Sequence, residues 1–61
     1  MKVREIIKLL QGDGWYLIGT KGSHMHFKHP HKPGKVTVAG RESEDVRKGT
    51  LNRILKQAGL K

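Results

Sequence analysis

The stretch TKGSHMHFKHPH, residues 20–31, contains all four histidines of the chain together with lysines. Alternation along it predicts a strand that presents His24, His26 and Lys28 on one face, with successive side chains about 7 Å apart. An imidazole beside ammonium groups suits cleavage of an RNA backbone, in which a 2′-hydroxyl loses its proton while attacking the adjacent phosphate. A histidine can accept that proton near pH 7, and lysines can stabilise the charge that develops on the phosphate. We therefore predict that a histidine of this face, His24 or His26, acts as a general base, with Lys21 in the adjoining turn and Lys28 as phosphate contacts.

The same histidines admit simpler interpretations. Any one of them can be a solvated side chain, and His29 and His31, which flank Pro30, are predicted to take no part in the chemistry. A His-x-His pair on a strand can also chelate a transition metal. No carboxylate lies nearby in the sequence to complete such a site, and the surrounding positive charge opposes a cation. We expect neither a metal nor another cofactor.

Charge is the strongest feature of the composition. Thirteen Lys and Arg residues oppose five Asp and Glu, for a formal net charge of +8. This excess indicates a polyanionic partner, with nucleic acid ahead of an acidic protein and an anionic membrane, although a merely solvated basic surface remains possible. No apolar run approaches the ~20 residues of a membrane span, and charges interrupt the apolar N-terminal segment. We expect a soluble, cytoplasmic protein with residues 1–61 as one domain.

The N-terminal segment has the pattern of an amphipathic helix. Its apolar residues Val3, Ile6, Ile7 and Leu10 fall at positions i, i+3, i+4 and i+7. The glycines of Gln-Gly-Asp-Gly then end the pattern. We predict a helix over residues 2–11.

Three short segments with alternating or β-branched residues follow. Residues 15–18, 23–28 and 35–39 are predicted strands. Residues 20–22 and 33–34 are predicted turns. Strands joined so closely are expected to form one antiparallel sheet, and the polar segment that follows the third strand is expected to be a loop.

A second helix is predicted near the end of the chain, beginning at Gly49 or Thr50 and ending at Gly59. Its apolar stripe repeats the spacing of the first helix, at Leu51, Ile54, Leu55 and Ala58. Arg47 and Lys48 precede or open this helix, where free backbone N–H groups can bind a phosphate. A solvated basic helix start fits the same residues.

The order helix-strand-strand-strand-helix predicts an α+β two-layer sandwich with both helices on one face of the sheet. The buried sheet face is predicted to carry Trp15, Leu17, Met25, Phe27, Val36 and Val38. The opposite face, predicted to be open to solvent, carries Tyr16, Ile18, His24, His26, Lys28 and Thr37. Further lysines, Lys21, Lys32 and Lys35, are expected in the adjoining turns.

Several segments together resemble the HicA toxins, small mRNA interferases of prokaryotic toxin–antitoxin pairs. They are a first helix ending in Gly-x-Gly-aromatic, then KGSHMHFKHP, a Val-Thr-Val strand and KGTLNRILKQAGL. The resemblance runs nearly from end to end. It implies a fold similar to the double-stranded RNA-binding domain, metal-independent cleavage of mRNA and inhibition by a HicB-like antitoxin.

The resemblance also implies roles for individual residues. The catalytic histidine of the family lies in its Gly-Ser-His segment, which corresponds to His24, so Gly22 and Ser23 are expected beside the RNA. The complete predicted RNA-binding set is Lys21, Gly22, Ser23, His26, Lys28 and Lys48. Family members often have a Pro and then a His after the third strand, whereas this chain has TVAGRESEDV. The departure implies either a weaker activity or the use of Arg41 in place of that histidine.

Two other functions compete with a ribonuclease. One is a non-catalytic RNA-binding module with the fold of a double-stranded RNA-binding domain, although such modules usually begin their second helix with Lys-Lys-x-Ala-Ala rather than RKGTLNRIL. The other is an interaction protein whose basic surface only binds an acidic partner. Loss of RNA substrate would favour the ribonuclease, a mobility shift without cleavage would favour the module, and a protein complex without RNA affinity would favour the third.

Overall fold

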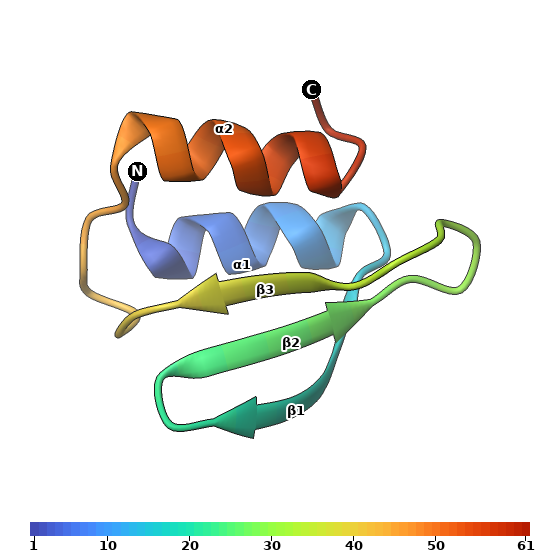
Figure 1. Cartoon of the computed structure of the whole chain (residues 1–61), viewed down its shortest axis with the longest axis horizontal. Coiled ribbons are helices and arrows are strands. Elements are labelled where there is room, and N and C mark those ends of the chain that lie inside the picture. Colours follow the sequence, from blue (N-terminus) through green and yellow to red (C-terminus); the bar gives the residue numbers. More distant parts are fainter.

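The computed structural model describes residues 1–61 and contains two helices and one three-stranded antiparallel sheet, in the order α-β-β-β-α (Figure 1). The elements are α1 (Val3–Gly12), β1 (Tyr16–Lys21), β2 (His24–Lys28), β3 (Val36–Ala39) and α2 (Lys48–Gln57). The predicted α+β class and element order are confirmed. The bounds differ mainly in β1, which continues to Lys21, and in the first turn, which lies at residues 22–23.

One hydrophobic core joins both helices to one face of the sheet. Phe27 of β2 and Val36 and Val38 of β3 are almost fully buried, as is Trp15 just before β1. The helices complete the core with Val3, Ile6, Leu10, Ile54 and Ala58. The predicted helical stripes and most of the predicted inner sheet face are therefore confirmed, because each set faces the same side of its element.

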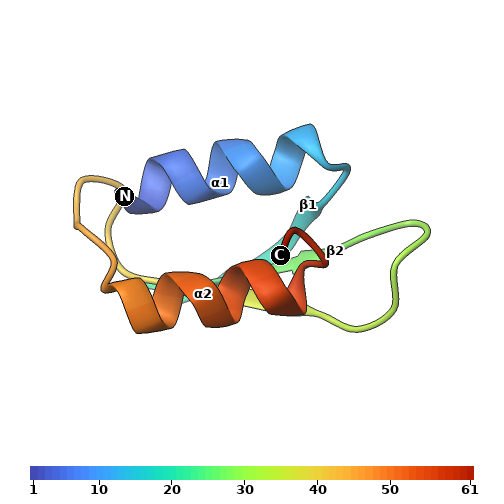
Figure 2. The same ribbon diagram turned by 90° about the horizontal axis from the view of Figure 1, so that it is seen from above.

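Leu17 is the exception to the predicted inner face. It pairs with Phe27, so the two side chains share a face of the sheet, yet Leu17 is 49% exposed. The helices run side by side near β3, and β1 lies at the far edge of the sheet (Figures 1 and 2). All six residues of β1 are exposed, so Leu17 faces the helix side of the sheet without a helix above it.

The loop between β3 and α2 caps the start of α1. The backbone N–H groups of Val3 and Arg4 donate to the carbonyl oxygens of Glu44 and Glu42, at 2.9 and 3.1 Å. The Glu5 carboxylate accepts a bond from the backbone N–H of Lys2 at 2.7 Å. These contacts satisfy N–H groups that have no partner within the helix, and the carboxylate also suits the positive end of the helix dipole.

Asp13 connects the other end of α1 to two distant segments. Its carboxylate forms an ion pair with Lys32, and it accepts a hydrogen bond from the Trp15 indole N–H at 3.2 Å. Lys32 also donates to the carbonyl oxygen of Ala58 at 3.0 Å. Lys32 therefore connects the β2–β3 loop to the ends of both helices. The sequence placed it among the free lysines beside the histidine face, but its ammonium group is paired with Asp13.

Candidate functional site

The turn between β1 and β2 places the predicted catalytic histidine at the start of a strand. Lys21 and His24 are paired residues, so Gly22 and Ser23 form a two-residue hairpin loop. Gly22 has a φ of 61°, while Ser23 keeps a negative φ, which matches a type II′ turn with glycine at its first central position. The Gly-Ser-His segment is thus a tight turn that delivers His24 directly into β2.

A bulge in β1 decides which face Lys21 occupies. Leu17 pairs with Phe27 and Gly19 with His26, so Ile18 is an extra residue without a partner. One extra residue moves every later side chain of the strand to the opposite face. Lys21 consequently lies on the same face as His24, whereas strict alternation from Leu17 would have turned it toward the helix side.

Four of the predicted site residues therefore share one face of the sheet. Lys21 is opposite His24 in the β1–β2 pair, and His26 and Lys28 follow at two-residue intervals along β2. His24 is exposed, and its ring makes no hydrogen bond within the protein. His26 is half-buried, with Nδ1 hydrogen-bonded to Thr37 Oγ1 at 3.0 Å. His24 is the histidine of this pair whose nitrogens remain available to a ligand.

A stripe of α2 borders this face and encloses a cavity of about 320 Å³ with it. Three cavity residues, His24, Thr37 and Ala39, come from β2 and β3. The α2 wall consists of Thr50, Arg53, Ile54 and Gln57. The predicted solvent-open face is thus bounded on its β3 side by a helix that brings a guanidinium, a hydroxyl and an amide to the cavity that His24 lines.

The remaining two histidines lie beyond the other end of β2. The His29 ring contacts Trp15 edge to face, with ring centroids 5.3 Å apart, and Nε2 is hydrogen-bonded to the carbonyl oxygen of Asp13 at 2.6 Å. His31 is exposed and its ring packs near that of His29. Neither ring lines the His24 cavity, and the expectation that both take no part in the chemistry stays a prediction.

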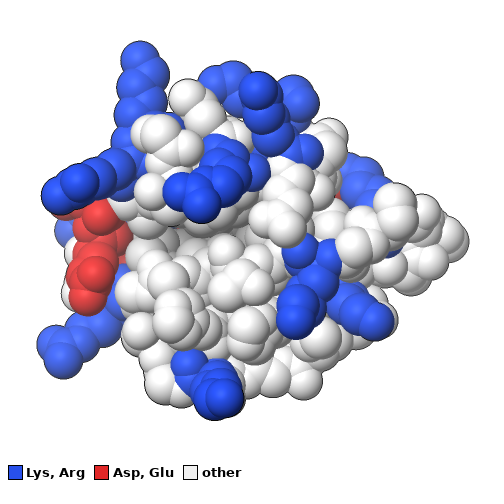
Figure 3. All heavy atoms as spheres, viewed as in Figure 1, with Lys and Arg blue, Asp and Glu red and all other residues white.

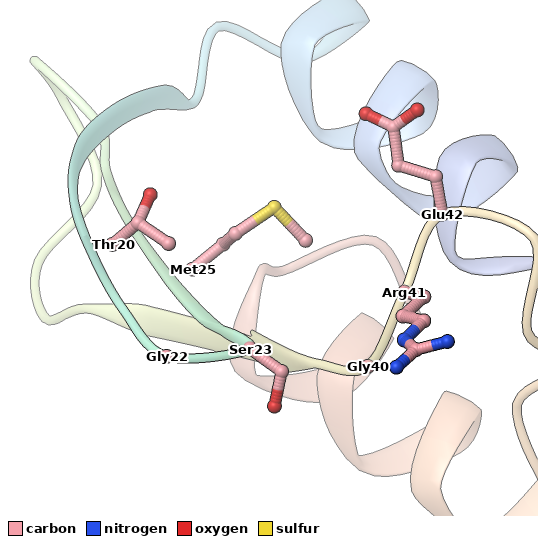
Figure 4. A pocket seen from close by; sticks show the side chains of 7 residues that line it. All are labelled: Thr20, Gly22, Ser23, Met25, Gly40, Arg41 and Glu42. Carbon is pink, nitrogen blue, oxygen red and sulfur yellow. The ribbon is translucent and has the colours of Figure 1, made fainter.

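Gly22 and Ser23 line a separate hollow, of about 450 Å³, with Arg41 and Glu42 (Figure 4). Met25 also lines it, and Met25 faces the side of the sheet opposite His24. Arg41, the residue expected to act in place of a family histidine, therefore lies in this second hollow and not in the His24 cavity. Lys48 is the exposed first residue of α2 and lines neither hollow.

A comparison with protein-family models adds independent information. The model described as the HicA toxin of bacterial toxin–antitoxin systems matches residues 3–60, which include every helix and strand. The chain belongs to the HicA toxin family. A search of curated proteins gave no match. Family membership makes this HicA protein the toxin of a toxin–antitoxin pair, with an antitoxin as its partner.

The charges of this HicA toxin are distributed unevenly. On the face shown in Figure 3, Lys and Arg side chains surround an uncharged centre, while carboxylates gather at one edge over the β3–α2 loop. Glu42, Glu44 and Asp45 belong to that loop. Asp13 is paired with Lys32 away from this face, and the hydrogen bond from Lys32 lowers the pKa of its carboxyl group below the ordinary value, with a smaller contribution from the Trp15 indole N–H. The histidine face thus has no carboxylate among the residues of its cavity.

Two further features of the structure concern a metal ion and a membrane. No three His, Cys, Asp or Glu side chains are grouped so that they could hold a metal ion. Neither helix has the length and apolar character needed to cross a membrane.

Sequence reasoning missed the α2 wall of the cavity. Thr50, Arg53 and Gln57 follow i, i+3, i+7 spacing and therefore form a stripe of their own next to the apolar stripe. That spacing was visible in the sequence of this HicA toxin. Its position beside His24 depends on how α2 packs along β3, which the spacing does not specify.

Proposed function

We propose that this HicA toxin is a metal-independent endoribonuclease that cleaves mRNA, with His24 as its general base. The observation that supports the proposal best is the exposed, unbonded imidazole of His24 in a cavity that also contains Arg53 and is free of carboxylates. A base needs a free nitrogen within reach of the substrate. A guanidinium in the same cavity suits a phosphodiester, because its planar fork matches phosphate oxygens.

The reaction uses only groups of the RNA and the protein. His24 takes the proton of a 2′-hydroxyl as that oxygen attacks the adjacent phosphorus. The bond from phosphorus to the 5′ oxygen of the next nucleotide breaks, and the His24 imidazolium returns its proton to that oxygen as it leaves. The products are a 2′,3′-cyclic phosphate and a 5′-hydroxyl end. Arg53 and Lys21 offset the extra negative charge of the phosphorane-like transition state, the usual role of cations in such sites.

The remaining predicted residues hold the RNA. Lys28 lies on the same face as Lys21 and His24 and extends the positive surface along β2. His26, fixed by Thr37, supplies a rigid edge beside His24. The turn residues Gly22 and Ser23 and the helix-start residue Lys48 are proposed as contacts to the backbone on either side of the cavity.

A HicB-like antitoxin is the proposed inhibitor. A net charge of +8 favours association with an acidic surface through long-range attraction. An acidic antitoxin that covers the histidine face would exclude RNA from His24 by occupying the same cations. We expect the complex to be inactive and to require salt well above physiological levels for dissociation of its charged contacts.

The deciding experiment measures RNA cleavage by purified protein in EDTA, with the variant His24→Ala and the matched control His31→Ala. We expect the wild type and His31→Ala to cleave RNA and leave 2′,3′-cyclic phosphate ends, and His24→Ala to lose at least a hundredfold in rate. DNA of the same sequence should survive, because it lacks the attacking hydroxyl. Equal cleavage by His24→Ala would refute the assignment, and RNA binding without any cleavage would support the binding module instead.

A further inference from the structure

A third hollow, separate from the one that Gly22 and Ser23 line, lies beside the His24 cavity and shares one residue with it. The residues around this hollow, which measures about 490 Å³, are Gly49, Asn52, Arg53, Lys56 and Lys61. Arg53 belongs to both sets, so its side chain stands between the two hollows. A ligand too long for the His24 cavity can therefore continue past Arg53 into the third hollow.

The side chains around the third hollow indicate which kind of ligand it can bind. Its side chains are three cations and an amide, with no apolar side chain and no Asp or Glu among them. The Lys61 ammonium donates to the Asn52 side-chain oxygen, which connects the C-terminal residue to α2. The centres of protein–protein interfaces are instead rich in apolar and aromatic groups. A fully polar, positive hollow of this kind fits a flexible polyanion.

We propose that this hollow is a subsite for the RNA backbone next to the cleaved bond, where Lys56 and Lys61 bind a flanking phosphate. This subsite rests on the proposed ribonuclease function, because it extends the path of the RNA substrate from the His24 cavity. The RNA strand then crosses α2 at Arg53 and does not only follow the length of β2. Arg53 then contacts the scissile phosphate, and the two lysines contact the next phosphate along the RNA.

The subsite has a length-dependent signature. A dinucleotide has one phosphodiester and fills only the His24 cavity, whereas a longer strand reaches the lysines as well. Each phosphate contact to single-stranded nucleic acid contributes about 0.7 to the slope of log affinity against log salt. Loss of both lysines should therefore weaken binding of long RNA and reduce its salt dependence, with no effect on the dinucleotide.

The test compares Lys56→Ala/Lys61→Ala with Arg4→Ala/Lys8→Ala, a control that removes two exposed cations from α1. The probes are a 2′-O-methyl dinucleotide and a 2′-O-methyl 12-mer, which lack the free hydroxyl that cleavage needs, so binding is measured whether or not the protein is a nuclease. We expect the first variant to bind the 12-mer about tenfold more weakly at moderate salt, with a slope lower by roughly 0.7 for the one phosphate contact that is lost. The control should lose threefold or less, and dinucleotide binding should be unchanged in both.

Three results would overturn the subsite. They are equal losses in the two double variants, an equal loss on the dinucleotide, or a loss of antitoxin binding with RNA binding intact, which would assign the hollow to the protein partner. Length-dependent loss of binding in a protein that cleaves no RNA would support the subsite and refute the proposed catalysis. Cleavage of RNA without that length dependence would do the reverse.

Discussion

The histidine predicted to matter most for folding is His29, which lies outside the proposed active site. Its Nδ1 accepts the backbone N–H groups of His31 and Lys32, at 3.0 and 3.1 Å. An imidazole nitrogen that accepts carries no proton, so Nε2 carries the proton and donates to the Asp13 carbonyl at 2.6 Å. One ring thus joins the β2–β3 loop to the end of α1, and it also contacts Trp15.

Replacement of His29 by alanine should remove a large part of the stability. Three hydrogen bonds at about 0.5–1.5 kcal/mol each, reduced somewhat by partial exposure, and an aromatic contact of about 0.5 kcal/mol give a loss of roughly 2–4 kcal/mol. A chain of 61 residues is expected to have about 3–9 kcal/mol in total. The His29→Ala protein should therefore be marginally folded at 25 °C.

Urea unfolding monitored by Trp15 fluorescence measures this loss. With a slope near 1 kcal/mol per molar urea, expected for so small a protein, the midpoint of His29→Ala should fall by roughly 2–4 M. His31→Ala is the matched control, because the exposed His31 ring makes no hydrogen bond, and it should cost less than about 0.5 kcal/mol. Equal destabilisation by the two substitutions would refute the view that the bonds of the His29 ring hold the loop.

Further predictions concern the ends of the helices. Because the fold lowers the pKa of Asp13, its ionised form stabilises the protein at pH values above the ordinary pKa of 3.8, and this contribution disappears as pH falls through the folded pKa. The difference in urea midpoint between wild type and Asp13→Asn should therefore vanish below pH 3.8. A difference that stayed constant from about pH 6 to about pH 2 would contradict the ion pair. Gly59 follows α2 with a φ of 72°, so Gly59→Ala should cost about 1–2 kcal/mol. Gly49→Ala, in the first turn of α2 with no atom within 4 Å of the added carbon, should stabilise by about 0.5 kcal/mol; thermal midpoints that moved in the same direction would contradict this contrast.

Much of the fold is predictable because it is encoded by local periodicity. The stripe Val3, Ile6 and Leu10 and the alternation through Phe27 each name a buried face, and the structure buries both. Leu17 shows that alternation predicts the face of a side chain but not its burial. Its position on the helix side of the sheet follows from alternation, but its burial depends on whether a helix extends as far as β1, and two helices of ten residues cover only the β3 side.

The candidate site is only partly encoded in this way. The shared face of His24, His26 and Lys28 follows from two-residue spacing within one strand. The position of Lys21 depends on a bulge at Ile18. An isolated glycine within a strand, here Gly19, is a signal for such a bulge, but the predicted strand ended at residue 18, so Lys21 was expected only as part of a turn. Arg53 is 29 residues from His24 in the sequence, and it reaches the cavity only through the packing of α2 along β3.

The two ends of β2 separate stability from proposed chemistry. His24 begins the strand beside Lys21, at the end where the proposed reaction takes place, whereas His29 follows its last residue and joins Asp13 and Lys32 in the contacts that hold the loops and helices together. Substitutions at sites without shared partners act nearly additively. His24→Ala should therefore abolish cleavage in a protein of nearly wild-type stability. His29→Ala should instead lower stability while the molecules that remain folded keep their full rate. Separate measurements of the folded fraction and of the rate per folded molecule therefore distinguish the two ends of the strand.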